Sequence, residues 1–245
     1  MSYSLEYLSP DGRRFRLIGA PYEVAFVPDE GIEGFIGEFE DSGVTMPGVH
    51  GRMVDYRDRT VSETTGTLHV RVIDPERWPD FIGAFHSRRE GTLVLEGERR
   101  FVLPVRLAPG FAPPEHKIKL GSEIALPLVS DRAVWQETGT GTGAVTVTNW
   151  GDVTVYPRIS WSGAGGAVIL PSGARFTLPS VPERHTVSLS PLDGGEVTNS
   201  RGVDKALSKS VGAVAEGVPI DTSRTFTVPT GARLEWEVGV FSPWR

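Results

Sequence analysis

Thr67-Leu-His-Val-Arg-Val-Ile73 alternates apolar and polar side chains, and this period of two predicts a half-buried β-strand. The next residue, Asp74, suits the N-cap of a helix, and Pro75 suits its first turn. Apolar side chains then recur at helical spacing, at Trp78, Phe81, Ile82 and Phe85. We therefore expect a helix that begins after Asp74 and ends at Gly91, a residue suited to the C′ position.

Two further strands are expected after this helix. Residues 92–96 and 100–107 are rich in apolar residues and flank Gly97-Glu98, a hairpin signal. Alternate apolar residues of the second strand share one face, namely Phe101, Leu103, Val105 and Leu107. Residues 67–107 therefore predict a β-α-β-β core.

The sequence changes character on both sides of this core. Short strands are expected at 15–18 and 22–27, followed by a stretch rich in Gly and acidic residues. We interpret this stretch as a long loop or an extended arm over about 28–59. After Leu107, the run Ala-Pro-Gly-Phe-Ala-Pro-Pro at 108–114 excludes regular structure. We place a boundary there, between domains 1–114 and 115–245.

The second domain predicts many short strands joined by turns. The clearest strand is 232–241, where Leu234, Trp236 and Val238 share a face. Others are expected at 117–128, 144–148, 153–161, 167–170, 174–178, 185–189 and 225–228. The run Glu137-Thr-Gly-Thr-Gly-Thr-Gly143 between them predicts a flexible loop. This pattern is typical of a β-sandwich, and the predicted fold class is mainly β.

Composition excludes several classes of function. The chain has 245 residues, a formal net charge of −6 and no cysteine. Disulfides and thiolate metal sites are therefore excluded, and the basic surface typical of a nucleic-acid-binding protein is not expected. We also expect no secretory signal, and no apolar run approaches the ~20 residues that span a membrane.

Motifs of catalysis and cofactor binding are not found in the sequence. It contains no Gly-x-Ser-x-Gly nucleophile elbow and no P-loop. The glycines at 139, 141 and 143 alternate, which does not fit the dinucleotide fingerprint. The five histidines form no local His-x-x-x-His pair. We therefore expect no catalytic residues, no metal, no cofactor and no enzymatic activity.

Two alternatives remain open in the second domain. Glu235 and Glu237 share one face of the last strand, where they form either a two-carboxylate glycosidase site or, as we favour, the solvent face of the strand. Trp150 and Trp161 are candidates for stacking on sugar rings, although tryptophan more often fills a core. The alternative function is therefore adhesion to a host-surface glycan.

The end of the arm provides candidate subunit contacts. These residues lie in a run of mixed charge and are Arg52, Tyr56, Arg57 and Arg59. Such a run is either a solvated loop or a contact made by arginine, which suits protein interfaces.

The order of these segments resembles a known family. The run Gly48-Val-His-Gly-Arg-Met-Val-Asp-Tyr-Arg-Asp-Arg-Thr-Val-Ser62, followed by the strand, helix and hairpin of residues 67–107, resembles the N-terminal domain of phage distal tail (Dit) proteins. Three later runs resemble the C-terminal sandwich of that family. They are Val147-Thr-Asn-Trp-Gly-Asp-Val-Thr-Val-Tyr-Pro-Arg-Ile159, Ile169-Leu-Pro-Ser-Gly-Ala-Arg-Phe-Thr-Leu178 and Pro229-Thr-Gly-Ala-Arg-Leu234. Residues 1–43 and 191–224 match less well.

The resemblance implies assembly rather than catalysis. Distal tail proteins of siphovirus-type phages form a hexameric ring through their N-terminal domains, with galectin-like sandwiches outside. The ring joins the tail tube to the tail-associated hub of the baseplate, and DNA passes through its lumen. For this chain, the resemblance implies a minor tail protein of the virion, located at the tail tip and assembled in the host cytoplasm. It implies neither specific nucleic-acid binding nor membrane insertion.

Overall fold

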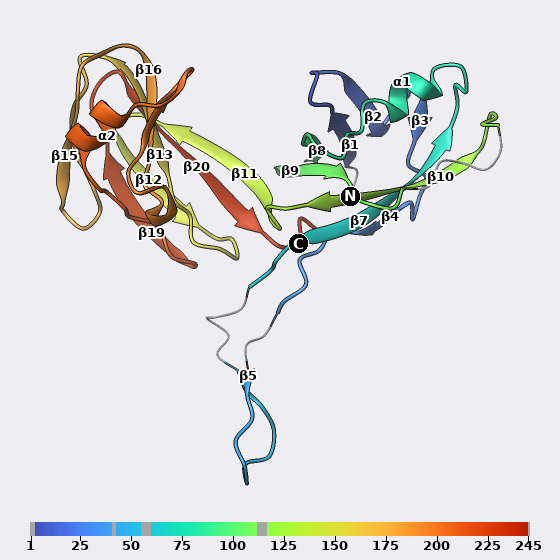
Figure 1. Cartoon of the computed structure of the whole chain (residues 1–245), viewed down its shortest axis with the longest axis horizontal. Coiled ribbons are helices and arrows are strands. Elements are labelled where there is room, and N and C mark those ends of the chain that lie inside the picture. Colours follow the sequence, from blue (N-terminus) through green and yellow to red (C-terminus); the bar gives the residue numbers. More distant parts are fainter. Residues whose placement is uncertain (1–2, 41–42, 55–59, 112–116, 245) are drawn as a thin grey trace. The chain divides into compact units, whose positions relative to one another are not determined.

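The computed structural model describes residues 3–40, 43–54, 60–111 and 117–244. The chain is mainly β and forms two compact units, one of residues 1–135 with 241–245 and one of residues 136–240 (Figure 1). The boundary expected at 114/115 lies outside the described residues, and the units divide after Trp135. The division falls there because β10 (Glu123–Ser130) pairs along its whole length with β7 (Thr64–Val72) of the first unit.

The first unit is built on one antiparallel sheet. Its strand order is β2-β1-β8-β9-β10-β7-β3, and β4 also pairs with β7. The remaining strands are β1 (Ser4–Leu8), β2 (Arg14–Ile18), β3 (Ala25–Phe26), β4 (Ile32–Gly34), β8 (Gly91–Glu96) and β9 (Arg100–Leu107). Val27, just after β3, donates its N–H to the carbonyl oxygen of Leu17 in β2 at 2.8 Å. The sheet therefore curls until its two ends meet.

One helix, α1 (Trp78–Ile82), supplies aromatic side chains to the core of this unit. The predicted apolar stripe is confirmed, because Trp78, Phe81 and Phe85 are buried. The predicted length was wrong, since α1 has only five residues. Asp74 accepts hydrogen bonds from the N–H groups two and three residues later, but these stabilise a turn that precedes the helix. The N–H of Gly83 still bonds to the carbonyl oxygen of Pro79, four residues back, whereas those of Ala84 and Phe85 reach back only three residues, which marks tight turns rather than α-helix.

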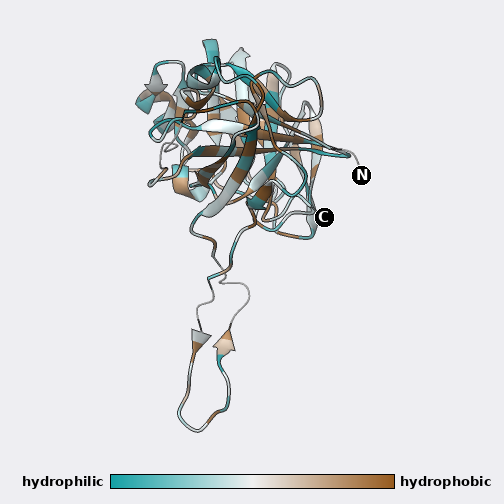
Figure 2. Ribbon diagram, turned by 90° about the vertical axis from the view of Figure 1, so that its right-hand side faces the viewer, coloured by the Kyte–Doolittle hydropathy of each residue, from teal (hydrophilic) through white to brown (hydrophobic). Residues whose placement is uncertain are grey.

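The predicted arm contains regular structure. Residues 30–36 run alongside β7, where β4 pairs with it, and Phe35 is buried in a left-handed backbone conformation at φ 57°. The indole N–H of Trp135 donates to the carbonyl oxygen of Phe35 at 2.9 Å, and a Cβ on Gly66 would lie 2.4 Å from the Phe35 ring. Residues 43–54 then form a separate hairpin of β5 (Gly43–Val44) and β6 (Met53–Val54), in which apolar and polar stretches alternate (Figure 2).

The second unit is a sandwich of two antiparallel sheets, as the sequence predicted. One sheet has the order β18-β17-β16-β13-β20-β11, and the other has the order β12-β19-β14-β15. The strands of the first are β11 (Trp135–Gly141), β13 (Arg158–Gly163), β16 (Val181–Ser188), β17 (Val197–Asn199), β18 (Gly202–Val203) and β20 (Ala232–Val240). Those of the second are β12 (Ala144–Asn149), β14 (Gly166–Ile169), β15 (Arg175–Leu178) and β19 (Thr222–Thr227). The core between the sheets is mostly aliphatic.

Two features of the sandwich were not expected. The glycine-rich run at 137–143 is largely strand β11 rather than a flexible loop, because Gly139 makes room for the indole of Trp236. A Cβ at Gly139 would lie 2.3 Å from that ring. The chain also forms a 3₁₀ turn, η2 (Pro191–Asp193), and a second helix, α2 (Lys205–Val211). The carboxylate of Asp204 caps α2 by accepting hydrogen bonds from the N–H groups of Ala206 and Leu207.

Candidate assembly surface

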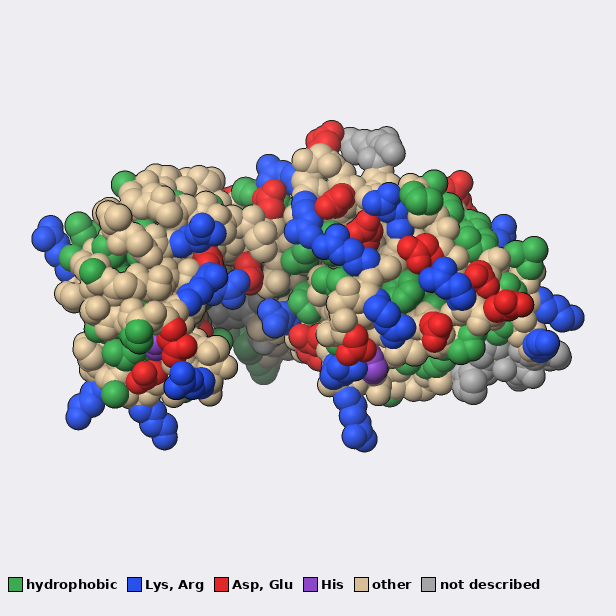
Figure 3. Space-filling view, turned by 90° about the horizontal axis from the view of Figure 1, so that it is seen from above, with side chains coloured by type: hydrophobic (Ala, Val, Ile, Leu, Met, Phe, Trp, Pro, Cys, Tyr) green, Lys and Arg blue, Asp and Glu red, His purple; other side chains and the backbone are tan. Residues whose placement is uncertain are grey.

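Large exposed apolar side chains are concentrated in the first unit. Among the described residues, nine of the thirteen belong to it, and four belong to the sandwich. Figure 3 shows a face of the molecule on which Lys and Arg side chains are interspersed with Asp and Glu side chains. Contiguous exposed apolar surface marks sites of protein association. The first unit is therefore the better candidate for an interface.

The hairpin of residues 43–54 is the most exposed apolar element. Residues 44–53 are all exposed, and the apolar ones among them are Val44, Met46, Pro47, Val49 and Met53. Val44 and Met53 lie opposite each other in the hairpin and are 63% and 59% exposed. An isolated two-stranded hairpin is marginally stable in water. Its exposed side chains therefore suit an element that is completed by a partner surface.

Arg52 is the predicted contact residue that the structure places on this hairpin. A Cβ at Gly43 would overlap the guanidinium group of Arg52, at 1.9 Å from Nε, so the long side chain of Arg52 lies across the start of β5. The other predicted contacts, Tyr56, Arg57 and Arg59, lie outside the described residues.

A second apolar surface forms where the C-terminal residues meet the 28–40 segment. The rings of Tyr3 and Trp244 pack edge to face with centroids 5.3 Å apart, and those of Phe39 and Phe241 do so at 4.9 Å. We call the exposed members of this surface the terminal ledge, which comprises Tyr3, Ile36, Phe39 and Trp244.

The terminal ledge is held in place by the backbone. Gly37 donates its N–H to the carbonyl oxygen of Phe241 at 3.0 Å, and a Cβ on Gly37 would lie 2.8 Å from the Phe241 ring. Beside the ledge lies a groove of about 340 Å³, lined by Tyr3, Pro28, Glu30, Gly31, Ile32, Gly34, Ile36 and Trp244. The first unit thus has a groove beside the terminal ledge and, separately, a hairpin with exposed apolar side chains.

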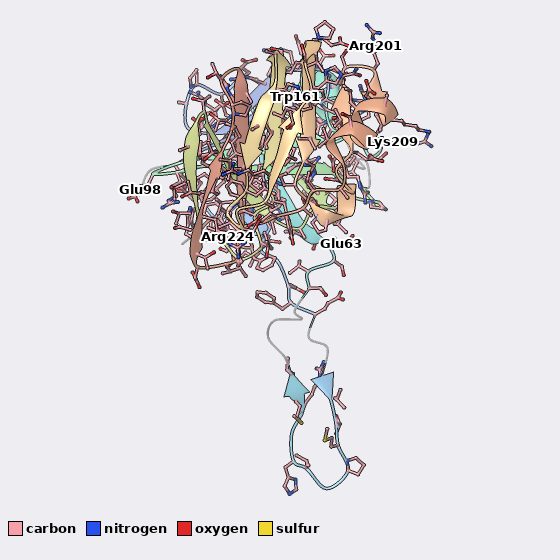
Figure 4. All side chains as sticks on the ribbon, turned by 90° about the vertical axis from the view of Figure 1, so that its left-hand side faces the viewer. Glu63, Glu98, Trp161, Arg201, Lys209 and Arg224 are labelled. Atoms are coloured by element: carbon pink, nitrogen blue, oxygen red, sulfur yellow. The ribbon has the colours of Figure 1, made fainter. Side chains whose placement is uncertain are left out.

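The two tryptophans proposed as glycan contacts differ in exposure. Trp161 is 2% exposed, lies among the strands of the sandwich (Figure 4), and donates its indole N–H to the carbonyl oxygen of Pro179 at 2.9 Å. Trp150 is partly buried against the core of the sandwich. Trp161 therefore has no open ring face for a sugar.

The carboxylates considered for a glycosidase are held by arginines. Arg158 contacts Glu237 at 2.6 Å and Glu235 at 3.4 Å. Arg184 contacts Glu235 at 2.5 Å, and the hydroxyl of Ser160 donates to the same carboxylate. The arrangement is a surface ion-pair network rather than an acid–base pair.

The structure also bears on metal binding and on membrane insertion. Within the described residues, no three His, Asp or Glu side chains gather in a way that would hold a metal ion. No helix of the described residues is long and apolar enough to cross a membrane.

Comparison with known proteins shows which fold the chain has. No family model matches the chain, and no curated protein matches it in sequence. Its structure matches the Dit protein of phage SPP1, described as a paradigm of the hub adsorption apparatus in phages that infect Gram-positive bacteria. The TM-score is 0.63 at 11% identity, over 98% of this chain and 99% of that one. The chain has the fold of a phage distal tail protein.

The distal tail fold also appears in the baseplate of phage P2. In structures of that baseplate in its activated conformation with Ca and with Sr, a chain matches with a TM-score of 0.57 at 9% identity, over 97% of this chain and 98% of that one. Both units therefore lie within the match, and the predicted resemblance to distal tail proteins is confirmed at the level of the fold.

Proposed function

We propose that this chain is a structural protein of a phage tail tip, which forms a ring between the tail tube and the hub of the baseplate. The observation that carries this proposal is the distal tail fold over nearly the whole chain, together with the exposed apolar surfaces of its first unit. The resemblance implies six subunits, a lumen for DNA and no enzymatic activity. In the virion, its partners are the tail tube protein and the tail-associated hub protein.

The ring contact is made by the hairpin of one subunit on the terminal ledge of the next. A closed ring needs two different surfaces on each subunit, because its contacts are head to tail. The hairpin and the terminal ledge are two such surfaces, and both are apolar. Burying exposed methionine, valine and aromatic side chains against one another drives the association. The contact also includes the predicted contact residues Arg52, Tyr56, Arg57 and Arg59.

Light scattering and negative-stain electron microscopy of the purified chain test the proposal. We expect six-fold rings whose mass is that of six chains, and we expect the triple substitution Met46→Ser, Val49→Ser, Met53→Ser to release monomers with the fold intact. Leu192→Ser, which removes a still more exposed apolar side chain from the sandwich, is the control and should leave the rings in place. Rings that survive the triple substitution would show that the hairpin is not the contact.

A further inference from the structure

The sandwich has an open sheet edge that its fold leaves without a partner. Strand β12 is the first strand of the order β12-β19-β14-β15, and within the fully described sandwich β19 is its only pairing partner. All six residues of β12 pair with β19 in continuous register, so the strand is regular and unbulged. An edge of this kind is a template for pairing with another strand.

The register shows which backbone groups face the open side. Val228 donates its N–H to the carbonyl oxygen of Gly143 at 2.9 Å, and Ala144 lies opposite Thr227 in the next pair. In an antiparallel ladder, hydrogen-bonded pairs alternate with non-hydrogen-bonded pairs. The open side therefore presents the N–H and C=O groups of three exposed residues, Ala144, Thr146 and Thr148, while the residues between them are buried and bond to β19.

Neither charge nor proline protects this edge. The sequence of β12 is Ala-Val-Thr-Val-Thr-Asn. The opposite edge of the same sheet, β15, carries an exposed arginine, Arg175, and is followed by Pro179. In the other sheet, the edge strand β18 has only two residues, next to Arg201 and Asp204. Short edges, charges and prolines block unwanted pairing. In contrast to β15 and β18, β12 has none of these features.

The side chains beside the edge form a flat, uncharged surface. The hydroxyl of Thr146 lies 2.8 Å from that of Thr225, and the hydroxyl of Thr148 lies 2.8 Å from that of Ser223. Each outward-facing threonine of β12 thus pairs with a hydroxyl on β19. Threonine pairs across strands stabilise sheets. A further strand with threonine in the same positions would continue this pattern.

We propose that β12 is a pairing edge for the β12 strand of a second copy of this chain. The strand is complementary to itself in an antiparallel register centred on Thr146. In that register, Thr146 lies opposite Thr146 of the other copy, and Ala144 lies opposite Thr148. All the open-side groups then face one another, which gives about six backbone hydrogen bonds. No like charges meet across the contact, because β12 has no charges.

The pairing relates two copies by a two-fold axis, and it is separate from the head-to-tail ring contact of the first unit. It goes beyond the proposed ring, since it would join two rings, or two single copies where no ring forms. The pairing is therefore tested by a doubling of the measured mass, whether the starting species is a ring or a single copy.

Sedimentation velocity of the full chain over a range of concentrations tests this pairing. We expect the mass to double as the concentration rises. Thr146→Lys should abolish the doubling, because it places two lysines opposite each other across the two-fold axis, and high salt should partly restore it. Thr225→Lys is the matched control: it removes the same hydroxyl pair and adds the same charge to the same sheet face, but on a central strand. The mass of the Thr225→Lys variant should still double as its concentration rises.

Thr146→Pro provides a second variant that adds no charge. The N–H of Thr146 faces the open side, so proline removes no hydrogen bond within the sandwich while it removes one from the paired edge. Loss of doubling in both Thr146 variants, with circular dichroism unchanged, supports the pairing. Absence of doubling in the unmodified chain, or doubling that persists in Thr146→Lys, would overturn it. Failure of the ring proposal would instead appear as a transition from monomer to dimer.

Discussion

The two units differ in what they bury and in what they expose. The first unit encloses a cluster of aromatic rings, and its surface carries most of the large exposed apolar side chains. The sandwich encloses a mostly aliphatic core, and its free surfaces are an ion-pair network and a hydroxyl-bearing sheet. Apolar contacts suit a permanent ring, whereas a backbone edge suits a weaker and reversible contact. In the two proposals, apolar side chains of the first unit make the ring contact, and the backbone edge of β12 makes the contact between two sandwiches.

The largest expected effect is a loss of stability in the aromatic core of the first unit, with no such loss in the core of the sandwich. Phe81 is fully buried, and its ring lies within 5.3 Å of those of Phe15, Trp78 and Phe85. Phe81→Ala should lower the free energy of unfolding by about 3–5 kcal/mol, because it leaves a cavity among rigid rings. Denaturant titration measures the loss, and hydrogen exchange should place it in the first unit. Ile82→Ala, in the same helix but only partly buried, is the control with a smaller loss.

A glycine substitution tests the packing of β11 in the sandwich. Gly139→Ala should lower the free energy of unfolding by about 1–3 kcal/mol, because the added methyl group collides with the indole of Trp236. Gly97→Ala is the matched control in the first unit, since its Cβ would meet only the side chain of Tyr3, at an ordinary 3.7 Å. Equal stability of the two variants would mean that Gly139 is not needed for packing.

The hydroxyl of Tyr7 gives the aromatic core a dependence on alkaline pH. It donates to the carbonyl oxygen of Ala84 at 3.0 Å, and burial raises the pKa of Tyr7 from 10.0 to about 12. The folded chain thus keeps this proton to higher pH than the unfolded chain, so the free energy of unfolding falls as the pH rises from 10.0 to about 12.

Tyr7→Phe should remove this dependence and lower the free energy of unfolding at neutral pH by about 1 kcal/mol. Urea titrations of both proteins at several pH values measure the difference. The same alkaline slope in both proteins would contradict the role given to Tyr7.

The smallest expected effect is a change in how the free energy of unfolding depends on acid pH. Arg106 contacts both carboxylate oxygens of Asp131, at 2.7 and 2.8 Å, and these hydrogen bonds lower the pKa of Asp131 below 3.8. The stabilisation is present above pH 3.8 and is lost as the pH falls through the lowered pKa. Asp131→Asn should slightly reduce stability at neutral pH and flatten the acid slope. Thermal melts between pH 2 and 7 measure it, and an unchanged acid slope would argue against the pair.

The sequence predicted those parts of the fold in which side-chain periodicity and burial agree. The strand at 100–107 was predicted with the bounds that the structure has, and the apolar stripe of α1 was predicted correctly. Helix length was not, because Pro75, Pro79 and Gly83 make the segment a series of tight turns. Helix α2 was missed although Asp204 is a recognisable N-cap, since a seven-residue helix shows little periodicity.

The site was harder to predict than the fold. The terminal ledge was missed because its members, Tyr3, Ile36, Phe39 and Trp244, come from distant parts of the sequence. The glycines of β11 suggested flexibility, whereas their partner, Trp236, lies about a hundred residues later. Trp161 was chosen as a surface aromatic and is buried. In each case the deciding contact is non-local.

The most direct test of the central claim is a cryo-electron microscopy map of the assembled protein. We expect a six-fold ring in which density for residues 43–54 of one subunit lies against the terminal ledge of its neighbour, with the sandwiches outside. A ring held together by the sandwiches alone, with the hairpin projecting into solvent, would contradict it.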